Sequence, residues 1–303
     1  MSYTHFPHGA SSFGCPLPSN PRFYLNGKKH WWVQGNTGKD SNFGDTPEQP
    51  LKTMAQAFVR VRSGDVIHFT GNIREQLSTP VGIFDVTIIG EGPIRHADAH
   101  TGNNGYGAAT WKPPAAPVAT TPLLKIQQQG WRLFNILFQP VTDNPAVLLF
   151  RNGGAGDLER DASHAIIEGC RFDAGKEGIQ DSGGCAFVKI YNNLFRGQTT
   201  TSIDAVAGAG IGTLLCWHIA GNRFDGSVNS VILGLNESVV ERNTFGKFTT
   251  KSLDLTGGTG NNVIWQNYFF GTYSVGGGYI KANANDEWAG NYNSGGQTTS
   301  DPA

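Results

Sequence analysis

Charge is scarce in this sequence, and neither sign dominates. Of the 303 residues, 16% are charged, and the formal net charge is −1. Proteins that bind nucleic acids present a basic face to the phosphate backbone, so this composition argues against a nucleic-acid partner. Long apolar runs are also missing, because none approaches the roughly 20 residues that a membrane-spanning helix needs. We therefore expect neither a nucleic-acid partner nor a membrane partner.

Cysteine is rare and shows no metal-binding or redox pattern. The four cysteines are Cys15, Cys170, Cys185 and Cys216. None belongs to a CxxC pair, and no histidine stands at zinc-finger spacing from them. This density is too low for a disulfide framework, so we expect reduced and mostly buried thiols. The sequence predicts no metal site and no cofactor.

Glycine, by contrast, is abundant. The chain has 41 glycines, while hydrophobic residues make up only 38% of it. That balance is typical of a β protein with many turns and a long, thin core. Residues 1–22 are rich in Ser, Pro, Gly and aromatic residues without periodicity, so we interpret them as an extended arm. These first residues also lack the basic and apolar regions of a secretory signal peptide.

A short amphipathic helix is expected within residues 44–61. Thr46 suits an N-cap, and Pro50 suits a first helical turn. The apolar residues at helical spacing are Leu51, Met54, Ala55 and Phe58. The helix is followed by SGDVIHFTG and VGIFDVTIIGEGP, which alternate as short strands that end in glycine turns.

From residue 132 onward the chain repeats one motif: a strand, a small polar residue, one spacer residue, a phenylalanine and a turn. The clear copies are IIEGCRF at 166–172, KIYNNLF at 189–195, HIAGNRF at 218–224, VVERNTF at 239–245 and VIWQNYF at 263–269. The aligned small residues are Cys170, Asn193, Asn222, Asn243, Asn267 and Asn291, at spacings of 23, 29, 21, 24 and 24 residues. This variable period suits one turn of a three-sided solenoid with its insertions in loops.

Stacking of these coils explains the residue types in the motif. One coil is too small to bury its own apolar face, so each coil packs on the next at the ~4.8 Å strand spacing. The phenylalanines at 172, 195, 224, 245 and 269 are then expected to form an internal column. The asparagines are expected to form an amide ladder at a tight corner, where Asn tolerates left-handed backbone angles.

These repeats, with the segment from TPEQPLKTMAQAFVRVRSGDVIHFTG to VTIIGEG, resemble the pectin-lyase-like superfamily over residues 31–293. The resemblance implies an all-β fold, a right-handed parallel β-helix (three-sided solenoid) with a short N-terminal capping helix and an extended N-terminal arm. We divide the chain into a docking arm at 1–22, a leading segment with the capping helix at 23–64, the parallel β-helix at 65–293 and a polar tail at 294–303.

The resemblance also implies where chemistry is to be sought, on the outside of one sheet. The catalytic motifs of known groups, which are calcium-binding Asp clusters with Arg or Lys and the NTD, DD, GHG and RIK series, are absent. One constellation remains: Asp181, Asp204 and Asp254 each lie eleven residues after a ladder position. Asp181 and Asp204 on neighbouring coils would suit a retaining glycosidase pair or a Ca²⁺ site. The alternative is exposed aspartates before glycine turns.

Trp31 and Trp32 form a second aromatic candidate, next to the arm. Tryptophan rings can stack on sugars, so these two residues are candidates for sugar stacking. The alternative, which we prefer, is that they close the blunt end of the solenoid.

The arm and the missing signal peptide lead to the expected function. Virion proteins are made in a host cytoplasm and act outside cells, and this chain resembles bacteriophage β-helix virion proteins. We expect a structural head-decoration or fibre-like protein, anchored to capsid or tail proteins through residues 1–22, with Phe6 and Phe13 filling partner pockets. The alternatives are a polysaccharide-degrading tailspike, lyase or hydrolase, and a non-catalytic carbohydrate-binding module. Host surface polysaccharide as a partner and a homotrimeric state stay open.

Overall fold

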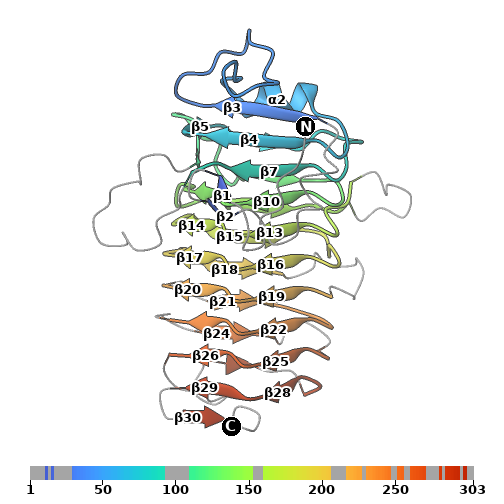
Figure 1. Ribbon diagram of the computed structural model, residues 1–303. Coiled ribbons are helices and arrows are strands. Elements are labelled where there is room, and N and C mark those ends of the chain that lie inside the picture. Colours follow the sequence, from blue (N-terminus) through green and yellow to red (C-terminus); the bar gives the residue numbers. More distant parts are fainter. Residues whose placement is uncertain are drawn as a thin grey trace.

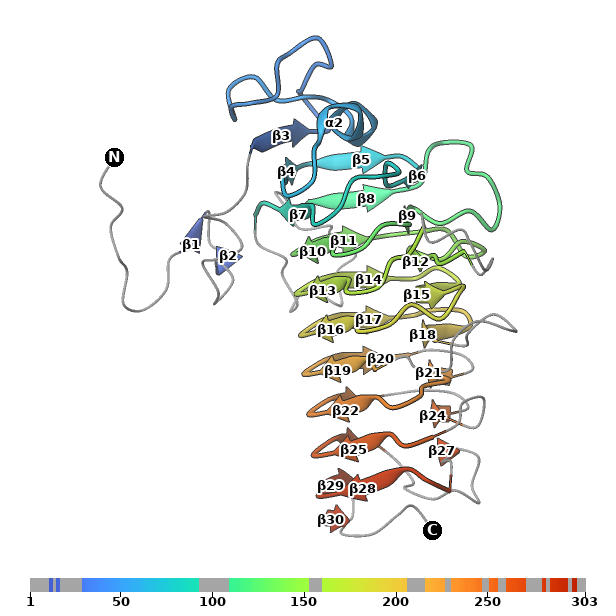
Figure 2. The same ribbon diagram turned by 90° about the vertical axis from the view of Figure 1, so that its right-hand side faces the viewer.

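The chain winds into an elongated stack of coils in the computed structural model (Figures 1 and 2). The structure describes residues 11–12, 15–16, 29–92, 109–152, 160–205, 216–226, 230–246, 251–255, 260–270, 280–281, 284–293 and 296–298. Three long sheets run along the stack, and successive coils add one strand to each sheet.

We number the three sheets in the order in which the chain reaches them. Sheet 1 contains β3 (His30–Gln34), β4 (Val66–Thr70), β7 (Thr87–Gly90), β10 (Arg132–Phe134), β13 (Ile166–Glu168), β16 (Lys189–Tyr191), β19 (His218–Ala220), β22 (Val239–Glu241), β25 (Val263–Trp265) and β28 (Glu287–Ala289). Sheet 2 contains β5 (Asn72–Arg74), β8 (Thr110–Lys112), β11 (Leu137–Phe138), β14 (Arg171–Asp173), β17 (Leu194–Arg196), β20 (Arg223–Asp225), β23 (Thr244–Phe245), β26 (Tyr268–Phe269), β29 (Asn291–Asn293) and β30 (Gly296–Thr298). Sheet 3 contains β6 (Leu77–Ser78), β9 (Leu124–Ile126), β12 (Val147–Leu149), β15 (Glu177–Asp181), β18 (Thr201–Asp204), β21 (Ser230–Leu233), β24 (Lys251–Asp254) and β27 (Ile280–Lys281).

All strand pairs within these sheets are parallel except β29 with β30. A parallel pair needs a crossover connection, and here the other two sides of each coil supply it. The fold is therefore the expected right-handed parallel β-helix with three sides. Residues 296–298, part of the expected polar tail, pair antiparallel with β29 at the C-terminal end of sheet 2.

The phenylalanine column is confirmed and is longer than expected. Phe172, Phe195, Phe224, Phe245 and Phe269 stack with ring centroids 4.6, 5.0, 5.1 and 4.8 Å apart. Phe138 extends the column, with its ring centroid 5.2 Å from that of Phe172, and Trp111 lies 6.0 Å beyond Phe138. The rings repeat at the strand spacing because they occupy the same inward position of sheet 2 in successive coils.

The amide ladder is confirmed. The side-chain oxygen of each ladder asparagine accepts hydrogen bonds from the coil before it. For example, Asn243 Oδ1 accepts from the backbone N–H of Asn222 at 2.8 Å and from its Nδ2 at 3.0 Å. The same pattern links Asn193 to Asn222, Asn243 to Asn267, and Asn267 to Asn291. These asparagines are fully buried, so the ladder satisfies amides that would otherwise lie unpaired in the core.

Cys170 occupies the ladder position of its coil, as expected. Its backbone N–H donates to Asn193 Oδ1 at 2.8 Å, and its thiol is fully buried. Burial raises the pKa of this thiol to about 12, so it stays protonated. Cys170, Cys185 and Cys216 are free thiols, which agrees with the expected absence of disulfides for these three.

The left-handed residue of the corner is not the ladder asparagine but the residue before it. Asn192, Arg242 and Gln266 have φ angles of 54°, 52° and 54°, and Gly221 and Gly290 take the same place in their coils. The preceding residue makes the bend, and the ladder residue is then free to turn its amide inward. The expectation that the ladder asparagines themselves are left-handed is therefore wrong.

A second, shorter ladder lies five residues before the first. Asn262 Oδ1 accepts from the backbone N–H of Ser238 at 3.0 Å, and Asp286 Oδ1 accepts from Asn262 Nδ2 at 2.8 Å. Ser238 Oγ in turn accepts from the backbone N–H of Trp217 at 2.9 Å. The mixed residue types hide this ladder in the sequence.

The capping helix is confirmed but begins later than expected. α2 spans Met54–Arg60 with Thr53 as its N-cap, whereas Thr46 and Pro50 lie in the preceding loop. The reason is a long-range contact: the Asp40 carboxylate accepts hydrogen bonds from the backbone N–H groups of residues 52 and 53. These bonds hold the approach to the helix in extended conformation.

α2 lies over the N-terminal end of the core. Met54, Ala57 and Phe58 are its buried residues, so Ala57 takes the place expected for Ala55. A helix in this position protects apolar side chains and a sheet edge that an open solenoid would expose.

Most of the expected docking arm lies outside the described residues, including Phe6 and Phe13. Two described pieces, β1 (Ser11–Ser12) and β2 (Cys15–Pro16), pair antiparallel with each other. They form a small sheet of their own that is not part of the three solenoid sheets.

Candidate functional site

The outer face of sheet 1 gathers polar and aromatic side chains from five consecutive coils. Glu168, Tyr191, Glu241 and Trp265 occupy equivalent outward positions, with Ala220 between Tyr191 and Glu241. Lys189 and His218 lie side by side two residues earlier on their strands. Because alternate residues of a strand face the same side, these two rows form one surface.

Three of these side chains form a hydrogen-bonded chain across the face. Tyr191 Oη lies 2.8 Å from His218 Nδ1, and His218 Nε2 lies 2.8 Å from Glu241 Oε1. A carboxylate only accepts, so Glu241 selects the tautomer of His218 that carries hydrogen on Nε2. Nδ1 is then an acceptor for the hydroxyl of Tyr191. We call Tyr191, His218 and Glu241 the relay.

The carboxylate is the most buried member of the relay. The Glu241 side chain is 12% exposed, whereas His218 is 37% exposed. Partial burial, followed by the negative charges of Glu241 and Glu168, raises the pKa of Tyr191. The phenol therefore stays neutral at neutral pH and donates its hydrogen bond to His218. Burial also raises the pKa of Glu168, next to Tyr191 in register.

Two cations and an aromatic ring flank the relay. Lys189 is exposed next to His218. The Arg242 guanidinium lies 5.4 Å from the centroid of the Trp265 ring and 3.9 Å from Glu241. The face thus presents a neutral phenol, a histidine, fixed positive charge and a planar ring.

The relay has the arrangement of an acid–base site. A hydroxyl bonded to a histidine that is itself oriented by a buried carboxylate is the logic of nucleophile–base–orienter triads. When His218 accepts the proton of Tyr191, Glu241 stabilises the imidazolium that results. The phenolic oxygen is then able to accept a proton from, and return one to, a molecule bound on this face.

The expected Asp181–Asp204 pair does not form. Asp204 lies opposite Gln180, not Asp181. A shift of one residue moves a side chain to the other face of the strand, so Asp204 faces outward while Asp181 faces the interior and is 3% exposed. The common direction predicted for these two carboxylates is therefore wrong.

One extra residue causes the shift. Glu177 stands seven positions after Cys170 in the sequence. Its partner in register, Thr201, stands eight positions after Asn193. Counting eleven residues from the ladder therefore reaches different faces in the two coils.

Asp181 closes a turn inside the fold. Its carboxylate accepts hydrogen bonds from the backbone N–H of Gly184 at 2.8 Å and of Cys185 at 3.2 Å. Burial raises its pKa to about 6, against the lowering effect of these bonds. Asp181 is thus placed as a structural residue.

Asp204 and Asp254 share the outward row of sheet 3 but are separated by Leu233. Asp254 is also bound to Lys251, with Nζ 2.6 Å from Oδ2. No two of the three aspartates are therefore adjacent as a catalytic pair. Within the described ranges, no group of three His, Cys, Asp or Glu residues is placed to hold a metal ion.

The two tryptophans next to the arm have different environments. Trp31 is buried in the core, where its Nε1–H donates to Asp65 Oδ2 at 3.0 Å. A buried ring is not available to stack on a sugar, so that prediction is wrong for Trp31, and closure of the solenoid end stays a prediction. Trp32 lies on the outer face, partly exposed and stacked on His68 with ring centroids 4.3 Å apart.

Beside Trp32 lies a second histidine network on the outer face of sheet 1. His68 Nδ1 lies 2.6 Å from Glu91 Oε1, and His68 Nε2 lies 2.8 Å from His30 Nδ1. Burial, followed by the proximity of His68, lowers the pKa of His30, while Asp65 opposes this change. The contact ties β3 to β4 at the N-terminal end of the solenoid.

Sequence reasoning missed the relay because its residues are far apart in the chain. The signal that could have found it is the ladder itself. Tyr191 and Glu241 each precede a ladder asparagine by two residues, and His218 precedes one by four. Each of these residues lies an even number of positions before a ladder asparagine. Because alternate residues of a strand face the same side, they lie on one face of sheet 1.

Comparisons with known proteins bear on the fold. No protein-family model matches the sequence, and no curated protein matches it. In the part of the chain that the structure describes, no helix is long and apolar enough to cross a membrane.

Several solved structures are similar in shape at low sequence identity. The pectate lyase Pel9A aligns with a TM-score of 0.50 and 12% identity, over 90% of this chain and 77% of its own. XylC in complex with xylose aligns with a TM-score of 0.42 and 9% identity, over 87% and 68%. A tailspike protein mutant of E. coli bacteriophage HK620 in complex with pentasaccharide aligns with a TM-score of 0.37 and 13% identity, over 88% and 54%. The similarity to the pectate lyase shows the fold alone, and the fold of this chain is a right-handed parallel β-helix.

Proposed function

We propose that the protein binds and cleaves an acidic polysaccharide on the outer face of sheet 1. The observation that carries this proposal is the relay, with its two hydrogen bonds of 2.8 Å. Polysaccharide degradation was the first alternative expected from the sequence, but the proposed site lies on a different face and uses different residues. The residues of this face follow one another along the stack of coils, which is the direction that an extended glycan would take.

The spacing of carboxylates favours elimination over hydrolysis. Glu168 and Glu241 lie three strands apart in one row, about 14 Å at the strand spacing. A pair of hydrolytic carboxyl groups stands only about 5–9.5 Å apart. The relay instead supplies a single proton-transfer centre, with Lys189 beside it to neutralise the carboxylate of an acidic sugar.

The proposed reaction balances without a cofactor. Tyr191 gives its proton to His218, and its oxygen takes the proton on the sugar carbon next to the carboxylate. The electron pair of that C–H bond forms a carbon–carbon double bond, and the bond to the leaving sugar oxygen breaks. Tyr191 returns a proton to that oxygen, and His218 then restores the proton of Tyr191.

The test is the formation of unsaturated sugars. Purified protein incubated with polygalacturonate, alginate or hyaluronan should raise the ultraviolet absorbance of at least one solution. Tyr191→Phe should lower the rate about 10²–10⁴-fold. Tyr268→Phe is the matched control, because Tyr268 is exposed on the outer face of sheet 2. Binding without product would indicate the third expected function, a carbohydrate-binding module, and neither binding nor product would contradict the proposal.

We further propose that the chain is a virion component that docks through residues 1–22. The supporting observation is that β1 and β2 pair with each other rather than with the solenoid. Phe6 and Phe13, outside the described residues, would fill pockets on capsid or tail proteins, and backbone pairing would add a strand. The particle would be assembled in the host cytoplasm, and a homotrimer would suit it.

Deletion of residues 1–22 tests the virion proposal. The truncated chain should keep the β-sheet circular dichroism of the full chain but fail to sediment with phage particles. Undiminished sedimentation of the truncated chain would contradict docking through the arm.

A further inference from the structure

A long loop at the N-terminal end of the solenoid lines an open pocket. The loop covers residues 35–53, between β3 and α2, and contains no helix or strand (Figure 2). It is tied to β3 by an isolated bridge from Leu51 to Val33 and by a hydrogen bond of 2.7 Å from the backbone N–H of Trp32 to the carbonyl of Gly44. Structureless loops longer than about 12–15 residues are uncommon in compact domains and usually functional.

The loop is held in one shape by dedicated contacts. Arg60 on α2 donates to the carbonyl oxygens of Asn42 at 2.8 Å and Asp40 at 3.3 Å. Asn42 Nδ2 donates to the carbonyl of Pro50 at 2.8 Å, which joins the two sides of the loop. A loop fixed in this way keeps a binding surface preorganised, so binding requires little further ordering.

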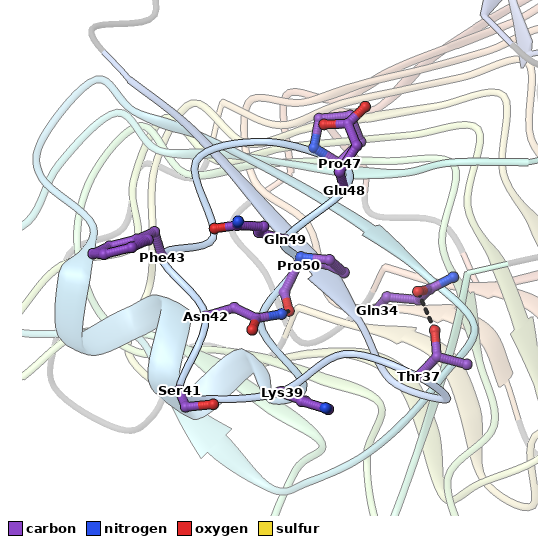
Figure 3. Close-up of a pocket in the computed structure, with 10 residues that line it drawn as sticks. All are labelled: Gln34, Thr37, Lys39, Ser41, Asn42, Phe43, Pro47, Glu48, Gln49 and Pro50. Carbon is purple, nitrogen blue, oxygen red and sulfur yellow. Dashed lines mark hydrogen bonds between the residues drawn. The ribbon is translucent and has the colours of Figure 1, made fainter.

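The cavity between the two sides of the loop has a volume of about 490 Å³. That volume falls in the range of about 300–1,000 Å³ for small-molecule sites. We call it the end pocket, and Figure 3 shows the side chains around it. Its lining residues are Gln34, Thr37, Lys39, Ser41, Asn42, Phe43, Pro47, Glu48, Gln49 and Pro50.

The lining is polar, and three of its side chains have hydrogen-bonding groups that are available to a ligand. The side chains of Lys39, Ser41 and Gln49 are exposed and make no hydrogen bond or ion pair with any described residue. The ring of Phe43 is 72% exposed, although the Phe43 backbone is fixed by Arg60. An exposed phenylalanine beside free donors and acceptors offers a ligand an apolar surface and polar contacts together.

We propose that the end pocket binds one neutral pyranose unit of a glycan. A pyranose has hydroxyl groups that both donate and accept, which suits the amide of Gln49 and the hydroxyl of Ser41. Its C–H face suits the ring of Phe43. Lys39 and Glu48 carry opposite charges, so the lining favours no net charge on the ligand. This site lies at the end of the solenoid, apart from the relay, and does not depend on the proposed cleavage reaction.

Saturation-transfer NMR on the full chain tests the proposal. Glucose, galactose and N-acetylglucosamine are offered singly, and at least one should receive saturation from the protein. Phe43→Ala and Gln49→Ala should each weaken that binding about tenfold or more, as expected for losing one good contact. Both residues are exposed, so the variants should keep the circular dichroism and melting temperature of the parent chain.

A control variant separates the two sites. His218→Gln alters the relay and should leave saturation transfer to the neutral sugar unchanged. Loss of the signal in His218→Gln but not in Phe43→Ala would place sugar binding on sheet 1 and overturn the end-pocket proposal. Absence of transfer to all three sugars, or transfer that persists in both pocket variants, would also overturn it. None of these outcomes depends on cleavage of an acidic polysaccharide.

Discussion

The coils before β13 and the coils after it solve the same packing problem with different residues. In the later coils, asparagine and phenylalanine recur at fixed positions, and amides bond to amides through the core. In the earlier coils, Ile136 takes the ladder position, Trp111 continues the column, and α2 covers the end. The later coils thus have a core that repeats, and the earlier ones have a core of varied apolar side chains. Repeated residues allow a coil to be predicted from the sequence, but coils stack without them as well.

The largest stability effect should come from the middle of the phenylalanine column. Phe195→Ala removes a fully buried ring that stacks on Phe172 and Phe224, and should lower the free energy of unfolding by about 4 kcal/mol. Urea denaturation measures the change. Phe270→Ala is the control, because Phe270 is 63% exposed and its loss should cost less than about 0.5 kcal/mol. Equal losses of unfolding free energy in the two variants would show that the phenylalanine column does not stabilise the core.

The next effect tests the amide ladder. Asn243→Ala removes the acceptor of the Asn222 backbone N–H, one of the acceptors of Asn222 Nδ2 and the amide that donates to the carbonyl of Ile219. We expect a loss of about 3 kcal/mol, since each unsatisfied buried group costs about 1–3 kcal/mol. The neighbouring exposed Thr244→Ala should change the free energy of unfolding little. A near-neutral Asn243→Ala would remove the ladder as the distinguishing feature of the later coils.

The pH dependence of the earlier coils should show the histidine contact. The pKa of His30 is lowered in the folded state from its usual 6.5, so the unfolded state binds more protons as the pH falls through that value. By linkage, the stability contributed by neutral His30 is present above pH 6.5 and is lost as the pH falls below it. Thermal unfolding between pH 7.5 and 5 measures this loss, and His30→Gln should reduce the slope. An unchanged slope in His30→Gln would contradict the assignment.

The smallest effect should come from the boundary between the two regions. Cys170 stands in the ladder position, and its thiol already points at the carbonyl oxygen of Leu133 at 3.7 Å. Cys170→Asn should place an amide there and extend the ladder by one coil. We expect the free energy of unfolding to change by less than about 1 kcal/mol, because the new amide would have hydrogen-bond partners. A buried polar group without hydrogen-bond partners would cost more than that. A large loss in urea denaturation would show that the ladder cannot pass this coil.

The same contrast explains what the sequence could predict. The solenoid, the phenylalanine column and the amide ladder follow from residues that repeat in phase, such as Asn243 and Asn267. The start of α2 could not be placed, because the Asp40 carboxylate that holds residues 52 and 53 lies on another segment. The register of Asp181 failed for a related reason, since one additional residue in a loop changes the face without changing the count.

The candidate site was hidden by distance along the chain. Tyr191, His218 and Glu241 belong to three different coils, and none forms a local motif. They meet because each coil returns to the same sheet at the strand spacing. Once the ladder sets the phase of the coils, the offsets of these residues from it become informative.

The tautomer of His218 tests the relay most directly. Nitrogen-resolved NMR of histidine-labelled protein distinguishes hydrogen on Nε2 from hydrogen on Nδ1. The relay requires neutral His218 to carry its hydrogen on Nε2, bonded to Glu241, and to accept from Tyr191 at Nδ1. Tyr191→Phe should shift the Nδ1 resonance and leave the Nε2 hydrogen in place. Hydrogen on Nδ1 in the parent protein, or a spectrum indifferent to Tyr191→Phe, would contradict the relay and the function built on it.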